Sequence, residues 1–278
     1  MIPIVCTVRG CGAPLHREGT RYVDDRGHSF DIARSGYVNL LQPQDRRSRE
    51  PGDAGDAVAA RRRLLDAGAG EALIEALAAT VAELGQLPGA RALDIGSGEG
   101  SILGALTGRF GFEAAGIELS ARAADLAARR HPGVLWLVAN ADRGLPLADG
   151  SIDLILSITA RRNPAECARV LASGGRLVVA VPAADDLAEL RETALGRVIR
   201  EDRAAKVIGE HEALFEAAGR RESRDRKRFT AEQLGDLLAA TYRGGRAGRL
   251  ERVSMLDGLA VTLSHTIVVF RPRSMARR

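Results

Sequence analysis

The side chains with the clearest chemistry lie near the start of the chain, where two cysteines and a histidine stand close in sequence. Four residues separate Cys6 from Cys11, and His28 follows a pair of aspartates, Asp24 and Asp25. Thiolate, imidazole and carboxylate are the ligands that zinc takes in proteins, and a structural zinc site needs four of them. The spacing therefore predicts either a zinc site or the remains of one.

A second group of residues follows a short apolar stretch in the sequence ALDIGSGEGS. Asp94 precedes three glycines, Gly96, Gly98 and Gly100. Glycines at this spacing let the backbone approach a ligand and turn sharply into a helix whose first N–H groups are free. A dinucleotide fingerprint would place its third glycine at Ser101 and carries no acid directly before the glycines. Both details disfavour NAD.

A carboxylate closes the next apolar stretch, AAGIEL, at Glu118. There it can accept hydrogen bonds from both hydroxyls of a ribose. The acid, the glycine loop and the ribose carboxylate together fit a nucleoside without a pyrophosphate. The pattern resembles the class I methyltransferases that use S-adenosylmethionine, which hold the adenine at the position of Asn140 to Asp142. The resemblance implies these cofactor contacts: Asp94, Gly96, Ser97, Gly98, Gly100, Glu118, Leu119, Asn140 and Ala141.

The elements that must position these residues alternate between strands and helices. Short apolar strands separated by amphipathic helices predict a parallel sheet with helices on both faces. We expect strands over 90–96, 114–119, 134–140, 152–158, 176–182 and 265–270, and helices from about 101 and over 121–130, 164–172 and 231–242. A helical stretch over 57–84 is interrupted near Gly68 and Gly70. The expected fold class is α/β, a Rossmann-like methyltransferase sheet with a small N-terminal zinc-finger-like module.

Composition limits the class of protein. The chain has 278 residues and a net charge of +4, and its only lysines are Lys206 and Lys227. Arginine suits phosphate and stacked bases, although a GC-rich genome also encodes it often. Three cysteines are too few for a disulfide framework. No apolar run is long enough to cross a bilayer and the first residues do not form a signal peptide, so we expect a cytoplasmic protein with no membrane partner.

Chemistry excludes some methyl acceptors. Methylation of an exocyclic adenine amine usually comes with an Asn/Asp-Pro-Pro-aromatic turn, but Ser157 to Ala160 stand there. Carbon methylation of pyrimidines needs a cysteine nucleophile, and Cys167 lies within an expected helix, where packing is its better explanation. Direct attack by a ring nitrogen, an oxygen or a small-molecule amine remains. In that case the protein mainly aligns donor and acceptor.

The N-terminal half carries a closer resemblance. The segment HSFDIARSGYVNLLQPQDRRSREPGDAGDAVAARRRLLDAG, residues 28–68, is similar almost word for word to the RlmA family, and weaker similarity runs from Cys6 to about Pro182. These bacterial enzymes methylate the N1 of a guanine in a hairpin of 23S ribosomal RNA. The resemblance implies that a zinc module grips the hairpin and that the next domain binds S-adenosylmethionine. It places Pro51 to Asp53 and the helix at Ala60 to Arg62 beside the cleft.

The metal module departs from that family, which has a CxxC pair, a third cysteine and a CxxxH spacing. Here the first pair is stretched to Cys6 and Cys11, and Asp24 replaces the third cysteine. The implied metal ligands are therefore Cys6, Cys11, Asp24 and His28. Carboxylate is a competent zinc ligand, but thiolate-rich sets dominate closed sites. Packing of Tyr22, Phe30 and Tyr37 without a metal is the alternative.

The acceptor side also departs from the family. The family's MTPFAW-like segment is represented only by Thr241 to Arg243, followed by GGRAGR, and its IYAP stretch is replaced by Ile158 to Arg161. No aromatic residue is visible there to stack on a flipped guanine. Arg161 and Arg162 could stack or contact phosphate, or they could form a solvated loop. Asp142 is the candidate for the proton acceptor that a guanine N1 requires.

The expected organisation has three parts: a Cys/His module over 1–40, a linker with helices beside the cleft over 41–85, and a methyltransferase domain over 86–278. The expected function is S-adenosylmethionine-dependent methylation of guanine N1 in 23S rRNA, with an rRNA hairpin as partner. A small-molecule methyltransferase and a non-catalytic RNA-binding protein are the alternatives. The sequence leaves the oligomeric state open, a dimer included.

Overall fold

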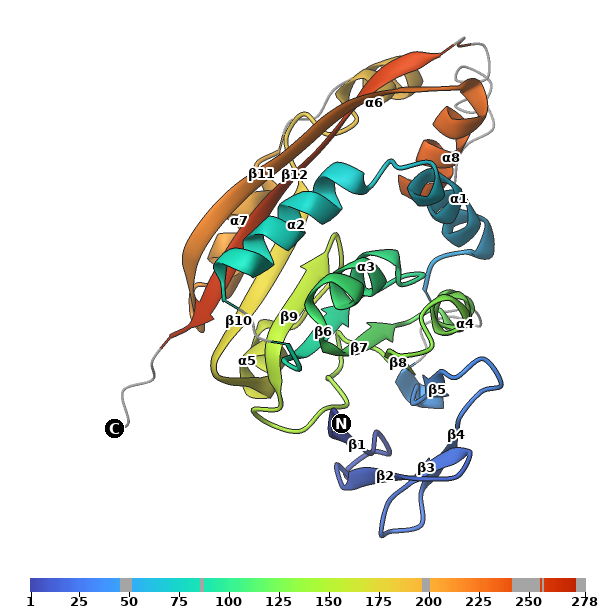
Figure 1. Ribbon diagram of the computed structural model, residues 1–278, viewed down its shortest axis with the longest axis vertical. Helices are drawn as coiled ribbons and strands as arrows, with labels where there is room; N and C mark the ends of the chain where they lie inside the picture. The colour runs from blue at the N-terminus through green and yellow to red at the C-terminus, as the bar shows by residue number, and fades with distance from the viewer. Residues whose placement is uncertain (46–51, 86–87, 197–200, 242–255, 257, 274–278) are drawn as a thin grey trace.

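An eight-stranded sheet forms the centre of the molecule in the computed structural model, which describes residues 1–45, 52–85, 88–196, 201–241, 256 and 258–273 (Figure 1). The strands lie in the order β11, β12, β10, β9, β6, β7, β8, β5. Their bounds are β5 (Val38–Asn39), β6 (Arg91–Ile95), β7 (Glu113–Glu118), β8 (Leu135–Val138), β9 (Ile152–Ile158), β10 (Leu171–Pro182), β11 (Phe215–Phe229) and β12 (Leu259–Pro272).

The sheet is mixed, where the sequence pattern predicted a parallel one. The strands from β10 to β5 are parallel to one another, but β12 runs antiparallel between β10 and β11. The chain places β7 and β8 on one side of β6 and then returns to place β9 and β10 on the other side. In such sheets ligands bind outside the carboxyl ends of the strands, where the strand order reverses. That point lies between β6 and β9.

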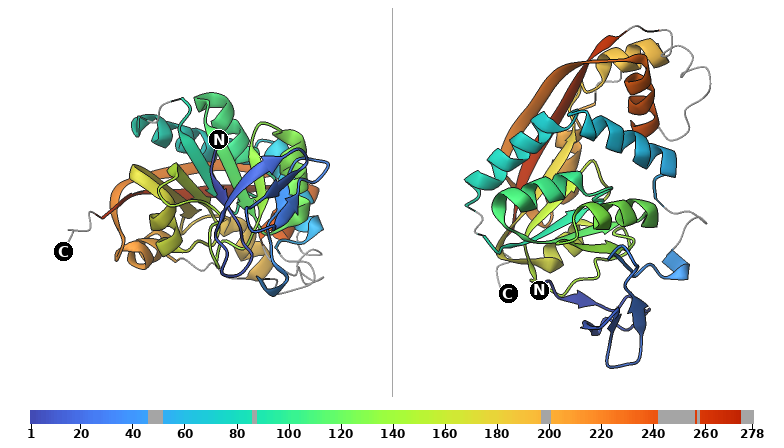
Figure 2. Two further views of the ribbon diagram at one scale, coloured as in Figure 1. Left: turned by 90° about the horizontal axis from the view of Figure 1, so that it is seen from below. Right: turned by 45° about the vertical axis from the view of Figure 1, so that its right-hand side comes forward.

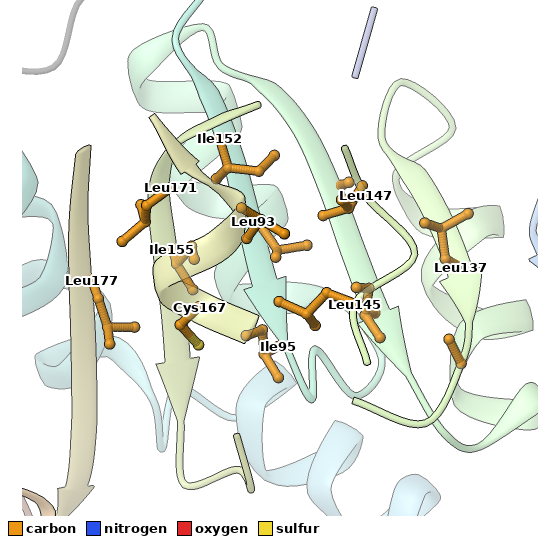
Figure 3. Packing of buried hydrophobic residues seen from close by; sticks show 14 of the residues in the cluster. Leu93, Ile95, Leu137, Leu145, Leu147, Ile152, Ile155, Cys167, Leu171 and Leu177 are labelled. Carbon is orange, nitrogen blue, oxygen red and sulfur yellow. The ribbon is translucent and has the colours of Figure 1, made fainter. Parts of the chain in front are cut away.

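Helices cover both faces of the sheet, as the strand and helix alternation predicted. One face packs against α2 (Glu71–Glu83), α3 (Ser101–Phe110) and α4 (Ala121–Arg130), and the other against α5 (Pro164–Val170) and α7 (Arg203–His211). Successive side chains of a strand point to opposite faces. Leu93 and Ile155 therefore join the buried cluster that contains Cys167 (Figure 3), whereas Leu154 joins the opposite cluster.

Three further helices gather at one end of the long antiparallel pair of strands β11 and β12 (Figure 1). They are α1 (Gly55–Asp66), α6 (Ala188–Leu195) and α8 (Ala231–Thr241), of which α8 connects β11 to β12. Leu64, Leu190 and Leu234 from these helices pack with Phe229 and Val261 of the two strands in a separate buried cluster. These helices and this end of the strand pair form a cap, and we use that name for them below.

The N-terminal residues form a small antiparallel sheet of four strands: β1 (Ile4–Val5), β2 (Pro14–Glu18), β3 (Arg21–Val23) and β4 (Ser29–Asp31). Figure 1 and the right-hand view of Figure 2 show it at the opposite end of the molecule from the cap. Ile4, Tyr22 and Phe30 belong to the same buried cluster as one face of the large sheet. After β4 the chain enters the large sheet as β5, beside β8, and forms a 3₁₀ turn, η1 (Pro43–Asp45).

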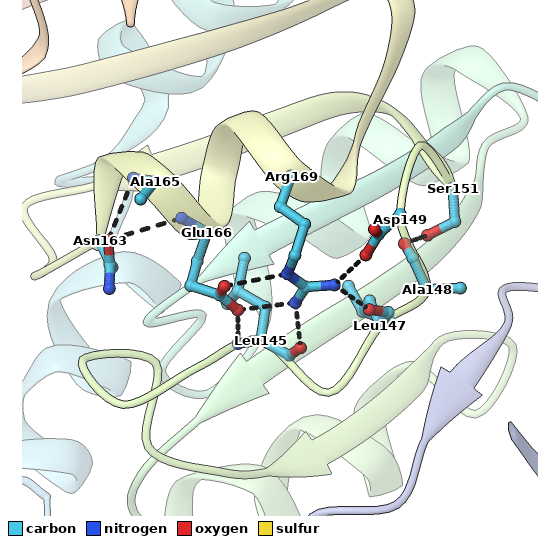
Figure 4. A network of polar contacts seen from close by, with 9 residues as sticks. All are labelled: Leu145, Leu147, Ala148, Asp149, Ser151, Asn163, Ala165, Glu166 and Arg169. Carbon is cyan, nitrogen blue, oxygen red and sulfur yellow. Dashed lines mark hydrogen bonds and ion pairs between the residues drawn. The ribbon is translucent and has the colours of Figure 1, made fainter. Parts of the chain in front are cut away.

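One arginine fixes the loop that leads into β9. Arg169 of α5 donates hydrogen bonds to the carbonyl oxygens of Leu145 and Leu147 and forms ion pairs with Glu166 and Asp149 (Figure 4). A guanidinium can satisfy several acceptors at once because its donors form a rigid planar fork. The LPLADGS stretch is thereby held against α5.

Several element boundaries differ from the sequence prediction. The helix expected over 164–172 ends at Val170, and β12 begins well before 265, at Leu259, and ends at Pro272. The arginine-rich stretch GRRESRDRKRFT, to which the pattern assigned no element, lies mostly within β11. Pro51, Tyr242, Arg243 and the GGRAGR tract lie outside the described residues. No helix within the described ranges combines the length and the apolar character needed to cross a bilayer.

Candidate functional site

The glycine loop joins the carboxyl end of β6 to α3, at the point where the strand order reverses. The backbone N–H groups of Gly96 and Ser97 donate to the carbonyl oxygen of Ile117 in β7. Gly96 has a φ of 73°, and a Cβ there would lie 2.4 Å from the Cβ of Ala160. A larger residue would therefore push the loop away from the turn after β9.

Two polar atoms beneath this loop are buried and lack a partner. Asp94 is 3% exposed, and no described group forms a hydrogen bond with its Oδ1 or with the Oγ of Ser97. Burial, together with the charges of Glu118 and Glu99, raises the pKa of Asp94 to about 7. Buried polar groups in native proteins nearly always have a partner. A ligand with hydrogen-bond donors would supply one here, so the site fits the polar, cationic end of S-adenosylmethionine.

Glu118 lies at the end of β7, beside the glycine loop. Its Oε2 accepts a hydrogen bond from the N–H of Gly98 at 2.9 Å, and its Oε1 accepts from the N–H groups of Leu119 and Ser120 at 2.8 Å each. Burial raises the pKa of Glu118, whereas these hydrogen bonds lower it. A carboxylate has about four acceptor positions, so Glu118 can also accept from a ribose.

The third strand end brings Asn140, Ala141 and Asp142 to the same edge of the sheet. Asn140 is buried, its side-chain amide donates to the carbonyl oxygen of Asp45, and its Oδ1 accepts from the N–H of Asp142. The Asp142 carboxylate pairs with Arg161 at 3.2 Å, and the Arg161 side chain is 79% exposed. The predicted cofactor residues thus come together from three neighbouring strand ends. Leu119 and Ala141 are only partly buried, and each packs against an apolar cluster.

A segment from Gly52 to Arg61 lies across these strand ends. Ser120 contacts the segment, since its Oγ lies 3.5 Å from the carbonyl oxygen of Asp53. Arg61 donates to the Asp53 carboxylate at 3.0 Å and to the carbonyl oxygen of Ala240 in α8 at 3.2 Å. Its Nη1 lies 3.7 Å from the point where a Cβ on Gly98 would stand. Arg61 therefore connects the cofactor edge of the sheet to the cap.

A cleft of about 1470 Å³ opens between the sheet edge and the cap. Its walls include Asp53 and Arg61, the turn after β9, the end of β10, and side chains from α6, α7, α8 and β12. Charged residues of both signs line it; the basic ones are Arg61, Arg162, Arg191, Arg203 and Lys206. The cleft thus adjoins the glycine loop and has room for a second, larger molecule.

The two arginines after β9 differ in their surroundings. Arg161 points outward to Asp142, whereas Arg162 lines the cleft and donates hydrogen bonds to the carbonyl oxygen of Ala160 and to Nε2 of His211. Cys167 is fully buried in α5, and burial raises its pKa to about 12. Packing is therefore the role of Cys167, as the sequence indicated, and it is not a nucleophile.

The four predicted metal ligands form one cluster at the base of the N-terminal sheet. The ligand atoms of Cys6, Cys11, Asp24 and His28 all lie within 4.8 Å of one another. Asp24 Oδ2 lies 2.8 Å from His28 Nδ1 and accepts from Cys11 Sγ at 3.2 Å. Burial would raise the pKa of Asp24, but hydrogen bonds from Cys6 and His28 hold it well below its usual value. Burial raises the pKa of Cys6 to about 12.

This donor set fits zinc. Two sulfurs, one imidazole nitrogen and one carboxylate oxygen make four ligands of the kinds that zinc accepts, close enough for tetrahedral binding. One observation also supports the alternative of packing without a metal: Tyr22 and Phe30 are buried in the same apolar cluster as Cys6. Tyr37 does not take part and packs against other clusters.

The strand order and the polar groups at the ends of β6, β7 and β8 define a class I S-adenosylmethionine-dependent methyltransferase. Residues 93–179 match the family model described as a methyltransferase domain, and residues 6–49 match the zinc-ribbon model described as RlmA, N-terminal. The chain is 38% identical over 275 residues to the 23S rRNA (guanine(748)-N(1))-methyltransferase of Streptomyces fradiae, covering 94% of this chain and 95% of that protein. The chain belongs to the RlmA family of methyltransferases.

Two further comparisons agree. A candidate 23S rRNA guanine-N1 methyltransferase from Micromonospora griseorubida is 32% identical over 289 residues, covering 94% of this chain and 95% of that protein. A solved structure described for the conversion of a disulfide bond into a thioacetal group during echinomycin biosynthesis covers 72% of this chain and 82% of its own, with 14% identity and a TM-score of 0.50. The latter shows a shared fold alone.

Sequence reasoning missed the residues on the cap side of the cleft. Asp186, Arg191, Arg203 and His265 line it, but each stands in a stretch without a recognisable motif. The one local signal is the pair of aspartates, Asp185 and Asp186, shortly before α6.

Proposed function

We propose that the chain transfers a methyl group from S-adenosylmethionine to N1 of a guanine in 23S ribosomal RNA, within a hairpin. The observation that carries this proposal is the similarity to the Streptomyces fradiae enzyme, which extends over both the N-terminal module and the methyltransferase domain. The name of that enzyme specifies guanine 748, and the same guanine is the first candidate for the target of this chain.

The cofactor residues of this proposal are those at the three strand ends. Asp94, the glycine loop, Glu118 and Asn140 would hold S-adenosylmethionine, with Leu119 and Ala141 packing beside them. The bound cofactor supplies a methyl group on a positively charged sulfur. Asp94 would supply negative charge at the cationic end of the cofactor, Glu118 would accept hydrogen bonds from its ribose, and the segment from Gly52 to Arg61 would cover the same edge of the sheet. Held in this way, the donor can be aligned with an incoming nucleophile.

The cleft supports a macromolecular acceptor. Pockets for small ligands measure roughly 300–1,000 Å³, whereas this cleft measures about 1470 Å³. A base within an RNA hairpin must leave its stack before an enzyme can reach its Watson–Crick edge. The cap and the sheet edge would receive that base between them, and the basic side chains Arg162, Arg203 and Lys206 would contact adjacent phosphates.

The N-terminal module contributes to the grip on the hairpin in this proposal. Cys6, Cys11, Asp24 and His28 would hold a zinc ion that closes the module by cross-linking its loops. The exposed arginines on the module, Arg17, Arg21 and Arg26, would then face the RNA. The metal has a structural role here and takes no part in methyl transfer.

The test is transfer of labelled methyl from S-adenosylmethionine to deproteinised 23S rRNA that lacks the modification, followed by nucleoside analysis. We expect label in N1-methylguanosine and none in 16S rRNA treated in parallel. Absence of RNA label from protein that still binds the cofactor would overturn the proposal and favour a small-molecule acceptor. Failure to bind the cofactor at all would favour a non-catalytic RNA-binding protein.

A further inference from the structure

We propose that Asp186 is the proton acceptor of the reaction, taking the N1 proton of the guanine as the methyl group arrives. The inference rests on the proposed function, because only an acceptor that carries a proton at neutral pH needs such a group. Guanine N1 is one of these acceptors. Neither a sequence motif nor the comparisons point to this residue.

The position of Asp186 is the first argument. It lies four residues after the end of β10, lines the cleft and is only 5% exposed. It is the one buried carboxylate among the described residues that line the cleft. The other lining carboxylates are less buried: Asp53 is half-buried, and Asp56, Glu201 and Glu210 are exposed.

The second argument is how firmly the carboxylate is held. Its Oδ1 accepts a hydrogen bond from the N–H of Ser264 in β12 at 3.0 Å, and its Oδ2 lies 3.6 Å from Nη2 of Arg191 in α6. The next residue, Leu187, has a φ of 52°, a conformation that costs free energy in a non-glycine residue. Within the described ranges only Thr159 shares this feature, and it lines the same cleft. Such strain is typical of functional sites.

The charges around Asp186 suit a base. The pKa of Asp186 is raised to about 6: burial and, to a lesser extent, the charge of Asp185 raise it, whereas the hydrogen bond from Ser264 and the charges of Arg191 and Arg203 partly offset this rise. His265, next to Ser264, is held neutral because burial lowers its pKa to about 4. The Asp186 carboxyl group is therefore ionised at neutral pH, with a pKa close to the working pH, where a general base is most effective.

The step balances as follows. The N1 lone pair forms the new bond to the methyl carbon, and the bond between that carbon and sulfur breaks with its electron pair remaining on sulfur. The N–H bond of N1 breaks and the proton passes to the Asp186 carboxylate, which returns it to water after product release. A carboxylate that faces the Watson–Crick edge also accepts from the guanine 2-amino group, so Asp186 would favour guanine over adenine.

Asp142 is the other candidate for this role. It lies outside the residues that line the cleft and pairs with Arg161 on the adenine side of the cofactor edge. Because Asp186 lines the cleft and Asp142 does not, Asp186 is the better candidate.

The experiment measures single-turnover methyl transfer to 23S rRNA at saturating cofactor, between about pH 5 and pH 9, for the unmodified protein and Asp186→Asn. We expect the variant to be slower by about 10²–10⁴-fold, with its cofactor affinity and melting temperature preserved. Its remaining rate should rise with pH through the alkaline range, where N1 loses its proton to solvent. The rate of the unmodified protein should fall below pH 6.

Asp185→Asn is the matched control, because it removes the same charge one residue away and outside the cleft. We expect its rate to stay within about threefold of the unmodified protein. A rate for Asp186→Asn within the same threefold range would overturn the proposal. A rate of the unmodified protein that stays constant down to pH 5 would also overturn it, and this measurement does not depend on whether a variant folds. If Asp142→Asn alone shows the loss and the alkaline rise, the role belongs to Asp142. No transfer to RNA by the unmodified protein means that the proposed function itself has failed.

Discussion

Asp94 lowers the stability of the folded protein when its carboxyl group is ionised, and we expect the same charge to favour cofactor binding. Its carboxyl group is buried without a partner for Oδ1, and burial together with Glu118 and Glu99 raises its pKa to about 7. Ionisation of Asp94 is therefore less favourable in the folded protein than in the unfolded chain. A bound cation would reverse this effect, because it favours the ionised form.

The pH dependence of stability follows from the sign of this shift. The folded pKa of about 7 lies above the ordinary value of 3.8, so the contribution of Asp94 to stability is complete below about pH 4 and is lost as the pH rises through 7. We expect Asp94→Asn without cofactor to melt at a higher temperature than the unmodified protein at pH 8, and at a similar temperature at pH 4. Calorimetry at the two pH values measures this.

The same variant should lose affinity for S-adenosylmethionine by about tenfold or more, because its amide carries no charge. Asp31→Asn, which removes an exposed carboxylate on the module, is the control for net charge. An Asp94→Asn protein that is less stable at pH 8 but binds the cofactor normally would contradict this account of the residue.

Local sequence patterns were enough to predict candidate residues that the structure brings close together. Asp94, the glycine loop and Glu118 follow directly from strand ends, and the cluster of Cys6, Cys11, Asp24 and His28 follows from short loops. Asp186 could not be found in this way. Its burial and its hydrogen bond depend on Ser264, which lies 78 residues further along the chain.

At the scale of elements, the segment from Gly52 to Arg61 lies against the edge of the sheet where we propose that the cofactor binds. Gly52 has a φ of 92°, and a Cβ there would lie 2.7 Å from the Cβ of Ser120. We expect Gly52→Ala to lift the segment from Ser120 and to weaken cofactor binding by about tenfold, since both strain and contact oppose it. Isothermal titration measures the affinity.

Gly89→Ala separates the two causes. Gly89 has a similar φ of 83° with nothing within 4 Å of the added Cβ, so this variant carries the conformational cost of about 1 kcal/mol without the contact. It should lose a little stability and keep its cofactor affinity. Equal losses of affinity in both variants would show that the segment does not control the site.

The zinc module offers a separate prediction. Asp24→Ala removes one of the four ligands, so we expect zinc affinity to fall by at least about tenfold, whereas Asp24→Cys should raise it. Competition with a chromophoric chelator measures the affinity. Asp25→Ala removes the exposed neighbouring carboxylate and should leave it unchanged. Equal affinities for Asp24→Ala and Asp25→Ala would exclude Asp24 as a ligand.

The sequence predicted the elements with strong periodicity and missed β11, which lacks it. The apolar strands β6 to β10 and their helices stand out because each buries its side chains on the sheet. β11 is an edge strand whose side chains are mostly exposed, so its arginine and glutamate residues give no alternation. Only its pairing with β12 makes it a strand.

At the scale of the whole molecule, the N-terminal module and the methyltransferase sheet share one buried cluster. Because Ile4, Tyr22 and Phe30 pack into that cluster, the module has a fixed position at one end of the sheet. The cap occupies the other end and the cleft lies between cap and sheet. The sequence pattern indicated a separate module over 1–40, but it could not show contacts between residues so far apart in the chain.

RNA binding should depend strongly on salt. Each phosphate that an arginine neutralises releases a counterion, so we expect the logarithm of the RNA affinity to fall with the logarithm of salt concentration with a slope of about −2 or steeper. S-Adenosylmethionine binding, which involves no polyanion, is the internal control and should change little. Filter binding over a salt series measures both. An RNA affinity that is insensitive to salt would contradict the grip by arginine residues.

The most direct test of the central claim is to map the modified nucleotide by reverse transcription. A methyl group on guanine N1 blocks Watson–Crick pairing, so the enzyme that copies the RNA stops there. We predict that 23S rRNA treated with the protein and S-adenosylmethionine gives a single new stop at a guanine in a hairpin, absent without the cofactor. Full-length copies from RNA treated with protein that binds the cofactor would contradict the claim.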